Sequence, residues 1–343
     1  MSFSKVVIEK MTYALPPNIV RSEELEEKLS PLYERLNLNI GRLELMTGIK
    51  ERRFWGSQQK ASEASAEAGI KLLQEGNIDP SSVDLLIHSA VCRDRLEPAT
   101  ASYVHNLMGL GQNTQILDVS NACLGFMNAL ILAGSMIEQG IIKRAIVVAG
   151  ENGKPLVDQT IKILNSGDFD RKSIKPYFAN LTIGGGAVAW SICSENNTYQ
   201  QGPRLSQFAS STDTSHNQLC EGDQSSGGMI MQTDSEELLH AGISVATHAW
   251  KKFLTASKWN PQSPELVITH QVGKAHQQEI EKALSYDPQN SFTTYESLGN
   301  CGSVSLPITY TLACEQNAGF LKSKSALLGI GSGLSSLMLA LNN

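Results

Sequence analysis

The chain alternates short apolar runs with longer stretches in which apolar residues recur with a helical period. Short runs that are apolar throughout and bounded by turn residues fit strands buried on both faces. Six such runs are predicted as strands, at residues 5–8, 84–88, 145–148, 186–189, 265–269 and 326–329. Helical stretches rich in small residues are predicted at 123–138 and 303–315. This alternation predicts an α/β fold of parallel strands covered by helices on both faces.

A constant offset of 181 residues aligns these elements in pairs and predicts an internal duplication. Residues 84–88 align with 265–269, 145–148 with 326–329, and 5–8 with 186–189. We therefore expect two halves, 1–180 and 181–343, that stack as similar sheets and share helices. A polar stretch at 154–180 is predicted to join them. A second polar stretch, 196–234, is predicted as a long excursion, either a functional cover or a mobile surface insertion.

The composition is that of a globular protein and excludes several classes of function. Hydrophobic residues make up 41% of the 343 residues and charged residues 18%, which does not fit a disordered chain. The 28 Lys and Arg residues against 34 Asp and Glu give a net charge of −6, so nucleic acid is not an expected partner. Charges interrupt the N-terminal segment, and the glycine-broken apolar run 326–341 is shorter than a membrane span. We expect a cytoplasmic protein without a leader or membrane span.

The cysteines and histidines give no sign of a metal site. Six cysteines, at positions 92, 123, 193, 220, 301 and 314, are widely spaced and form no CxxC pair. This spacing favours reduced thiols over a disulfide framework or a zinc ribbon. His270 and His276 have the wrong spacing for two ligands on one helix face, and the sequence has no HExxH motif.

Cys123 stands where a strand-like segment ending at Asp118 gives way to an apolar helical stretch. The unpaired N–H groups and the dipole at a helix N-terminus stabilise a thiolate. We therefore expect the pKa of Cys123 to be lowered towards or below neutrality. Cys123 is a candidate nucleophile. The alternative is a buried cysteine that only fills space.

His270 and Asn300 are the polar residues that the predicted topology brings towards Cys123. His270 follows the run 265–269, and the carboxyl ends of parallel strands face the crevice where α/β proteins bind ligands. Asn300 lies between nearby glycines, on the duplicate of the Cys123 segment. The alternatives are a surface or core histidine and a simple turn. Together the three groups permit thioester chemistry, in which the thiolate takes an acyl group and the others stabilise an enolate oxygen.

Four motifs stand in order along the chain: Asn-Ala-Cys123-Leu-Gly-Phe, Thr-His270-Gln-Val, Gly-Asn300 followed by Ser305 and Pro307, and Gly-Ile-Gly-Ser-Gly333. In this order they resemble the thiolase superfamily, specifically the β-ketoacyl synthase III-like condensing enzymes. The resemblance covers the chain from Thr47 to its end. It implies a five-layered αβαβα fold of two duplicated halves, usually a homodimer. It also implies acyl-CoA or acyl-carrier-protein thioesters as substrates, with no tightly bound cofactor.

The resemblance implies a role for each motif residue. Cys123 would be the acylated nucleophile, and His270 and Asn300 would hold the oxygen of the second thioester. The backbone N–H groups of Cys123 and of the turn containing Ser332 and Gly333 would form the oxyanion hole. Loss of one such donor typically costs about 3 kcal/mol of transition-state stabilisation.

The stretch 93–102 discriminates among subfamilies. Its sequence Arg-Asp-Arg-Leu-Glu97-Pro-Ala-Thr-Ala-Ser resembles the enzymes that condense two long-chain acyl-CoA molecules head to head in bacterial olefin biosynthesis. In that group the glutamate matching Glu97 reaches into the partner subunit's site as general base. A malonyl thioester becomes nucleophilic by losing CO₂, whereas an ordinary acyl thioester must lose an α-proton to a base. The expected reaction is therefore a non-decarboxylative Claisen condensation. The alternative for Glu97 is a solvated carboxylate beside Arg93 and Arg95.

Other functions compete with this one. The main alternative is decarboxylative condensation with malonyl-CoA or malonyl carrier protein in fatty-acid or secondary-metabolite biosynthesis. Acyl transfer to a hydroxyl or amine, and a non-catalytic acyl-binding subunit, are further alternatives. Lys50, Arg52 and Arg53 are candidates to bind the phosphates of coenzyme A or a phosphopantetheine carrier, or else form a solvated basic face.

Overall fold

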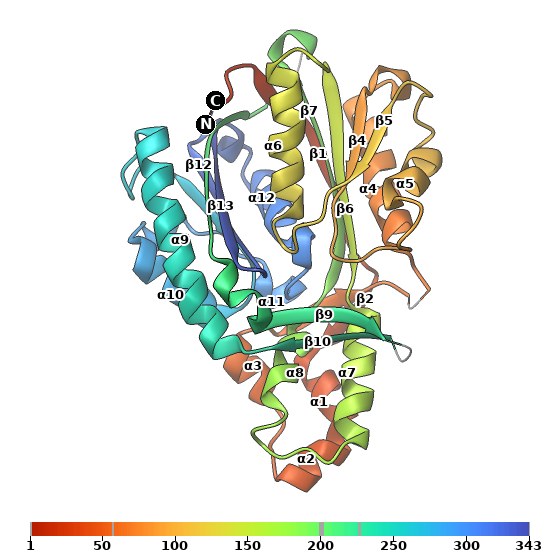
Figure 1. Cartoon of the computed structure of the whole chain (residues 1–343), viewed down its shortest axis with the longest axis vertical. Coiled ribbons are helices and arrows are strands. Elements are labelled where there is room, and N and C mark those ends of the chain that lie inside the picture. Colours follow the sequence, from red (N-terminus) through yellow and green to blue (C-terminus); the bar gives the residue numbers. More distant parts are fainter. Residues whose placement is uncertain (1, 57, 199–201, 226–227, 343) are drawn as a thin grey trace.

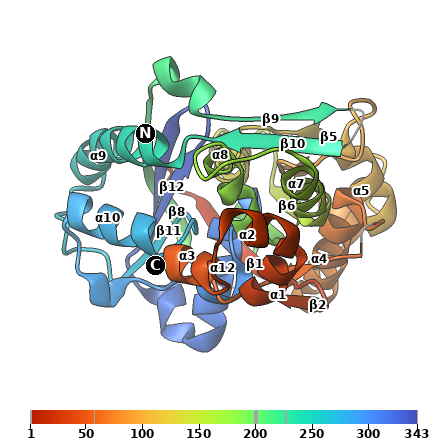
Figure 2. The same ribbon diagram turned by 90° about the horizontal axis from the view of Figure 1, so that it is seen from below.

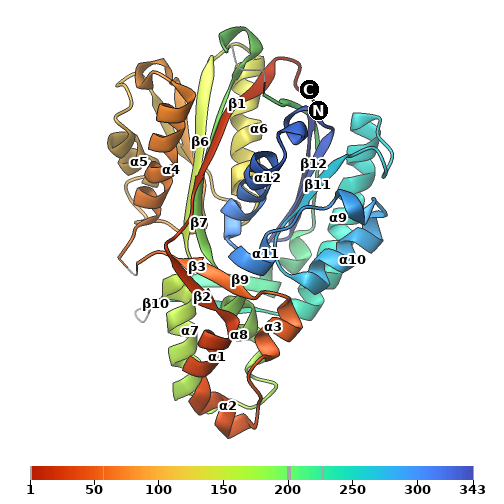
Figure 3. The same ribbon diagram turned by 180° about the vertical axis from the view of Figure 1, so that it is seen from behind.

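Most of the strands form one hydrogen-bonded sheet that folds back on itself. The computed structural model describes residues 2–56, 58–198, 202–225 and 228–342. Among these residues nine strands are joined in the order β11-β12-β13-β8-β1-β7-β6-β4-β5. The two parts of the sheet meet where β1 and β8 pair, at Val7 and Arg204. The parts face one another in Figure 1 and, from behind, in Figure 3.

Each part of the sheet combines parallel and antiparallel strands. The first part holds β1 (Val6–Ala14), β4 (Leu85–His88), β5 (Gln115–Asp118), β6 (Arg144–Asn152) and β7 (Gly185–Ser194). The second holds β8 (Arg204–Thr212), β11 (Leu266–Thr269), β12 (Ser325–Gly331) and β13 (Ser335–Asn342). All six predicted strands are present. Pairing is parallel for β4 with β5 and β6 and for β11 with β12, but antiparallel for β6 with β7 and β12 with β13. The expectation of parallel strands throughout is therefore wrong.

Helices fill the space between the two parts and cover both outer faces, which gives the expected five layers (Figures 1 and 3). Between the parts lie α6 (Gly125–Glu138) and α12 (Ser305–Gln316), the two predicted helices. The outer faces carry α4 (Ala61–Gly76) and α5 (Thr100–Met108) on the first part, and α9 (Ser235–Ser257) and α10 (Lys274–Leu284) on the second. Trp190 of β7 contacts Phe126 of α6 at 5.4 Å and Tyr310 of α12 at 5.6 Å between ring centroids. Both central helices therefore share one core.

The sheet order corrects one of the strand pairs that the offset aligns. The offset of 181 residues holds for β4 with β11 and for the start of β6 with that of β12. However, the order β1-β7-β6-β4 corresponds to β8-β13-β12-β11, so β1 matches β8 and not β7. The offset fails there because residues 153–184 insert helices between β6 and β7, whereas a short turn joins β12 to β13. In the sheet, β7 of the first part ends at Ser194 and β8 of the second part begins at Arg204, whereas the division of the chain into halves after residue 180 stays a prediction.

A lobe below the sheet in Figure 1 carries five further helices, and Figure 2 shows it from below. Its elements are α1 (Ser22–Lys28), α2 (Ser30–Leu36), α3 (Arg42–Thr47), α7 (Lys154–Ser166), α8 (Lys175–Phe178), the ribbon of β2 (Asn18–Arg21) and β3 (Glu51–Phe54), and the ribbon of β9 (Cys220–Ser225) and β10 (Gly228–Thr233). Short 3₁₀ turns occur at Pro80–Ser82, Ala179–Thr182, Glu195–Asn197, Thr214–Leu219, Pro288–Asn290, Gly302–Val304 and Ala318–Lys322.

This lobe overturns two predictions about polar stretches. Residues 154–180 are not merely a joint, because α7 buries Val157 and Leu164 against Leu29 and Leu32 of the N-terminal helices. Residues 196–234 are not merely an excursion, because they supply β8 to the sheet as well as the β9–β10 ribbon. In both stretches the polar composition concealed the buried residues, because each segment is amphipathic and buries only one face.

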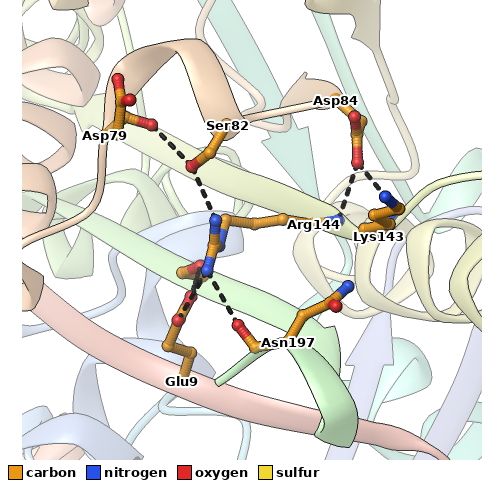
Figure 4. A network of polar contacts seen from close by, with 8 residues as sticks. Glu9, Asp79, Ser82, Asp84, Lys143, Arg144 and Asn197 are labelled. Atoms are coloured by element: carbon orange, nitrogen blue, oxygen red, sulfur yellow. Dashed lines mark hydrogen bonds and ion pairs between the residues drawn. The ribbon is translucent and has the colours of Figure 1, made fainter. Parts of the chain in front are cut away.

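Arg144 fixes the start of β6 to its surroundings (Figure 4). Its guanidinium group donates to both carboxylate oxygens of Glu9 at 2.9 Å, and also to Ser82 Oγ at 2.6 Å and to the Asn197 carbonyl oxygen at 3.2 Å. Asp84 accepts the backbone N–H of Arg144 at 3.0 Å. A bidentate arginine–carboxylate pair fixes orientation as well as distance, so this end of β6 is rigid.

Two further expectations concern the chain as a whole. Within the ranges described above, no helix combines the length and the apolar character needed to cross a membrane. All six cysteines are unpaired, as their spacing predicts.

Candidate active site

Cys123 lies in the turn between β5 and α6, as the sequence predicts. Ala122 before it has φ of 45°, a left-handed conformation that is strained for a residue with a Cβ. The backbone N–H of Leu124 donates to the Asn121 carbonyl oxygen at 2.9 Å and closes the turn. This geometry places Cys123 immediately before the first turn of α6, between the strand and the helix.

The predicted lowering of the Cys123 pKa is wrong. Burial of the sulfur raises the pKa of the thiol to about 12, and the charges of Glu151 and Cys220 add to the rise. The backbone N–H of Cys123 opposes the rise but does not offset it. Loss of hydration acts on the whole charge of the thiolate, whereas the helix N-terminus offers only a partial positive charge. Desolvation therefore has the larger effect on the pKa of Cys123. Cys123 therefore rests as a thiol.

His270 follows β11 directly and is 5% exposed. Its backbone N–H donates to the Leu328 carbonyl oxygen of β12 at 3.1 Å, which extends the strand pairing by one residue. Burial, together with His276, lowers the pKa of His270 to about 3. The imidazole is therefore neutral at physiological pH, and a neutral imidazole can donate one N–H bond without carrying charge.

Asn300 lies just after α11 (Tyr295–Leu298), in a loop held by backbone bonds on both sides. Its N–H donates to the Thr182 carbonyl oxygen, and its own carbonyl oxygen accepts from Gly184, both at 2.9 Å. Its side-chain Oδ1 accepts the N–H of Gly302 at 3.0 Å. With Oδ1 engaged, Nδ2 is the end of the carboxamide that can donate to a ligand.

Hydrogen bonds join the segments that carry these three residues. Gln271 accepts the backbone N–H groups of Thr294 and Tyr295 at 2.7 and 3.0 Å, and thereby ties the His270 strand to the segment before Asn300. Ser303 Oγ donates to the Ala122 carbonyl oxygen at 2.9 Å, which ties the Asn300 loop to the Cys123 turn. These bonds therefore connect the segments that carry Cys123, His270 and Asn300.

The turn that contains Ser332 and Gly333 joins β12 to β13 beside the Cys123 segment. A Cβ added to Gly331 would lie 3.0 Å from Leu124 Cγ and 3.5 Å from the Leu124 backbone nitrogen. Gly333 has φ of 110°, a conformation that favours glycine. Small residues are therefore required here by close approach and by backbone conformation.

Glu97 is exposed on the loop between β4 and α5, which stands out from the side of the molecule (Figures 1 and 3). Its neighbour Leu96 is 90% exposed. The guanidinium of Arg95 lies over the ring of Tyr103, so it is partly occupied by a contact within the loop region.

The three basic candidates lie in different environments. Arg52 is wholly buried and donates to Ser22 Oγ at 3.0 Å and to the Leu181 carbonyl oxygen at 3.1 Å, so its proposed contact with a phosphate is wrong. Lys50 is exposed but pairs with Glu296 at 2.8 Å. Arg53 donates to the Pro16 carbonyl oxygen at 3.3 Å. Of the three basic candidates, only Lys50 lines an open cleft of about 500 Å³, where it lies beside Thr293 and Ser297.

Comparison with known proteins gives a consistent answer. Residues 117–200 match the family model for 3-oxoacyl-[acyl-carrier-protein] synthase III, and residues 254–342 match the model for its C-terminal part. The acyl-CoA:acyl-CoA alkyltransferase of Shewanella oneidensis is 37% identical, with 99% of each chain covered. The enzyme of the same name from Xanthomonas campestris is 34% identical, with 98% of each covered. The chain belongs to this family of condensing enzymes.

Solved structures extend the family assignment to the fold. Cerulenin-bound OleA of X. campestris matches with a TM-score of 0.94 and 33% identity, over 100% of this chain and 98% of that one. OleA variants in which a cysteine, a glutamate or a histidine is replaced match over the whole of this chain as well. The family therefore confirms the thiolase fold and makes the protein an acyltransferase.

Sequence reasoning assigned no role to three residues that hydrogen-bond the segments of the candidate site: Glu151, Gln271 and Ser303. Gln271 follows His270 and Ser303 lies close to Asn300, so proximity to a motif was a usable signal for both. Glu151 ends an apolar strand, and nothing in the sequence distinguishes it from a solvated carboxylate.

Proposed function

We propose that the protein condenses two acyl-CoA thioesters head to head, without decarboxylation, to a β-keto product. The observation that carries this proposal is the position of Glu97. The glutamate and the cysteine replaced in the OleA variants are separated by the same number of residues as Glu97 and Cys123. In addition, the β-ketoacyl-[acyl-carrier-protein] synthase III of Campylobacter jejuni is only 22% identical to the chain, below either alkyltransferase.

In the first step the Cys123 sulfur attacks the carbonyl carbon of one acyl-CoA. A carbon–sulfur bond to Cys123 forms and the bond to the coenzyme A sulfur breaks. Because the raised pKa keeps Cys123 protonated, its proton leaves with the coenzyme A thiol and the step is balanced. The backbone N–H groups of Cys123 and of the turn containing Ser332 and Gly333 hold the oxygen that becomes negative.

In the second step the Glu97 carboxylate removes an α-proton from the second acyl-CoA. The electron pair moves to the carbonyl oxygen, which accepts hydrogen bonds from the His270 imidazole and the Asn300 carboxamide. The α-carbon then attacks the Cys123 thioester, and the Cys123 sulfur leaves and recovers a proton from Glu97. The product is a β-ketoacyl-CoA, and no bound cofactor is needed to balance either step.

The base is supplied by a second copy of this chain. β5 is the last strand of the sheet, and its Ile116 and Leu117 are 37% and 40% exposed. An exposed apolar edge strand offers unpaired backbone groups to an identical edge. Pairing of two copies along β5 would cover these side chains and bring the neighbouring loop, with Leu96 and Glu97, against the partner.

Lys50 is proposed as a contact for a coenzyme A phosphate at the mouth of its cleft, and Arg53 is kept as a weaker candidate. The Lys50 ammonium would exchange the exposed Glu296 carboxylate for the phosphate. The six free thiols favour the cytoplasm, where cysteines stay reduced.

Incubation of the protein with an acyl-CoA alone tests the reaction. We expect an acyl adduct on Cys123 by intact-mass measurement and a β-keto product by liquid chromatography and mass spectrometry. Addition of malonyl-CoA or malonyl carrier protein is expected to add nothing. A strict requirement for a malonyl donor would reject the proposal in favour of decarboxylative condensation.

A further inference from the structure

Glu151 is a carboxyl group buried at the carboxyl end of β6, with 4% of its surface exposed. Its Oε1 accepts the backbone N–H of Val91 at 2.7 Å and that of Ser303 at 3.2 Å. Its Oε2 accepts the backbone N–H of Cys92 at 3.0 Å. Burying a carboxylate is unfavourable unless hydrogen-bond donors surround it. These three bonds therefore hold the Glu151 side chain in place, and they hold the segments of Val91, Cys92 and Ser303 against the same carboxyl group.

The three donors belong to the segments that carry the proposed chemistry. Val91 and Cys92 begin the loop that bears Glu97, and Ser303 stands three residues after Asn300. The same Ser303 donates through its hydroxyl group to Ala122, the residue before Cys123. One carboxyl group therefore touches the Glu97 loop and the Asn300 loop directly, and the Cys123 turn through one intermediate residue.

The surroundings of Glu151 are built to admit it and to hold it. Gly302 has φ of 54°, and a Cβ there would lie 2.8 Å from Glu151 Oε1, so only glycine lets the loop approach. The Trp55 indole N–H donates to the Glu151 carbonyl oxygen at 3.1 Å. The far end of the same strand is fixed by Arg144 and Glu9. Glu151 thus projects from a strand that hydrogen bonds hold near both ends.

We propose that Glu151 is a positioning residue, which sets the Glu97 loop and the Asn300 loop against the Cys123 turn by accepting backbone N–H groups from both loops. Its effect on condensation rests on the proposed function, whereas its effect on the loops and on Cys123 does not. Burial raises the pKa of Glu151 although its backbone N–H donors oppose the rise, and the charge of the ionised group adds to the raised pKa of Cys123. Glu151 therefore acts on both the geometry and the charge of the site.

Two substitutions separate these effects. Glu151→Gln keeps the shape but removes the negative charge and places an amide N–H₂ among N–H donors. Glu151→Asp keeps the charge but shortens the reach. The matched control is Glu26→Gln, because Glu26 is also fully buried and accepts two backbone N–H groups, those of Gly41 and Leu43, in the lobe below the sheet.

Hydrogen exchange measured by mass spectrometry reports on the loops without any substrate. In both Glu151 variants we expect faster exchange in residues 89–99 and 298–304 and unchanged exchange in residues 36–44. Glu26→Gln should give the reverse pattern. Wild-type exchange at both catalytic loops in a folded Glu151 variant overturns the proposal, whatever the substrate of the enzyme turns out to be.

The pH dependence of Cys123 alkylation by iodoacetamide reports on the charge. We expect Glu151→Gln to shift this profile to lower pH, while Glu151→Asp and Glu26→Gln leave it in place. Condensation should fall in both Glu151 variants on the order of 100-fold, as for a displacement of about 1 Å, with Cys123 acylation falling less. An equal fall of acylation and condensation, with no shift in the profile, would indicate a merely structural role.

Discussion

Ser303 Oγ donates to the carbonyl oxygen of Ala122, and these two residues are 181 positions apart, the offset of the internal duplication. Each residue is therefore the counterpart of the other in the opposite half. Cys123, the candidate nucleophile, follows Ala122 directly, so this bond joins its turn to the half that carries His270 and Asn300.

Replacement of Ser303 by alanine tests this contact. The variant loses a partly buried hydrogen bond, which should lower the free energy of unfolding by about 1 kcal/mol, measured by urea denaturation. Condensation should fall by more than this loss explains, since the Asn300 loop is released from the Cys123 turn. Ser135→Ala is the control, because it removes an exposed hydroxyl bond to the Ile131 carbonyl oxygen on α6. Equal activity in the two variants would count against the role of Ser303.

Mixing two inactive variants tests whether Glu97 serves the partner's site. Glu97→Ala should keep Cys123 acylation and lose condensation, and Cys123→Ser should lose both. If subunits exchange, half of the dimers pair one variant with the other, and such a dimer has one complete site. Activity should then return to about a quarter of the wild-type value in a steady-state product assay. Absence of any recovery, with mixed dimers demonstrated by native mass spectrometry, would place Glu97 in its own subunit's site or outside the mechanism.

Arg52 and Lys50 should respond to substitution in opposite ways. Arg52→Ala leaves the buried Leu181 carbonyl oxygen and the Ser22 hydroxyl group without their donor, so we expect a loss of about 3 kcal/mol in the free energy of unfolding. Lys50→Ala should leave stability unchanged and raise the KM for acyl-CoA. A rise in KM for Arg52→Ala at unchanged stability would restore the phosphate-binding role that burial argues against.

Acid should destabilise the fold through three histidines. Burial lowers the pKa of His270 to about 3, and those of His88 and His276 to about 4. Below the ordinary histidine value of about 6.5 the unfolded chain binds protons that the folded chain does not, so stability falls as the pH drops from about 6.5 towards 4. The melting temperature, measured across this range, should fall less steeply in His276→Asn than in the wild type. Parallel curves for the two proteins would contradict the assignment.

Much of the fold is visible in the sequence because its strands are buried on both faces and its central helices are apolar. The lobe is not, because α7 presents Lys154, Asp158 and Lys162 to solvent and its buried stripe of Leu156, Val157 and Ile161 was outweighed by polar composition. The position of β7 was missed for another reason: a duplication offset survives only until one half gains an insertion.

The candidate site, like the fold, is predictable from the sequence only in part. Cys123, His270 and Asn300 follow from their places at the ends of strands and at a helix start, which local pattern predicts. The protonation of Cys123 does not follow, because it depends on how many atoms surround the sulfur and on Glu151, which is distant in sequence. The burial of Arg52 does not follow from the sequence either, because its neighbours Lys50 and Arg53 suggest a basic surface.

The central position of α6 bears on how the protein is made. Phe126 and Leu130 of this helix belong to the same buried core as residues of α12, and Trp190 beside it contacts Tyr310 of α12, which is translated far later. While the ribosome is still synthesising the rest, that face has nothing to pack against, and the same holds for any gene fragment that stops before residue 305. Expression of such a fragment should give aggregated material, so a split version of this enzyme would need both pieces present in the same cell.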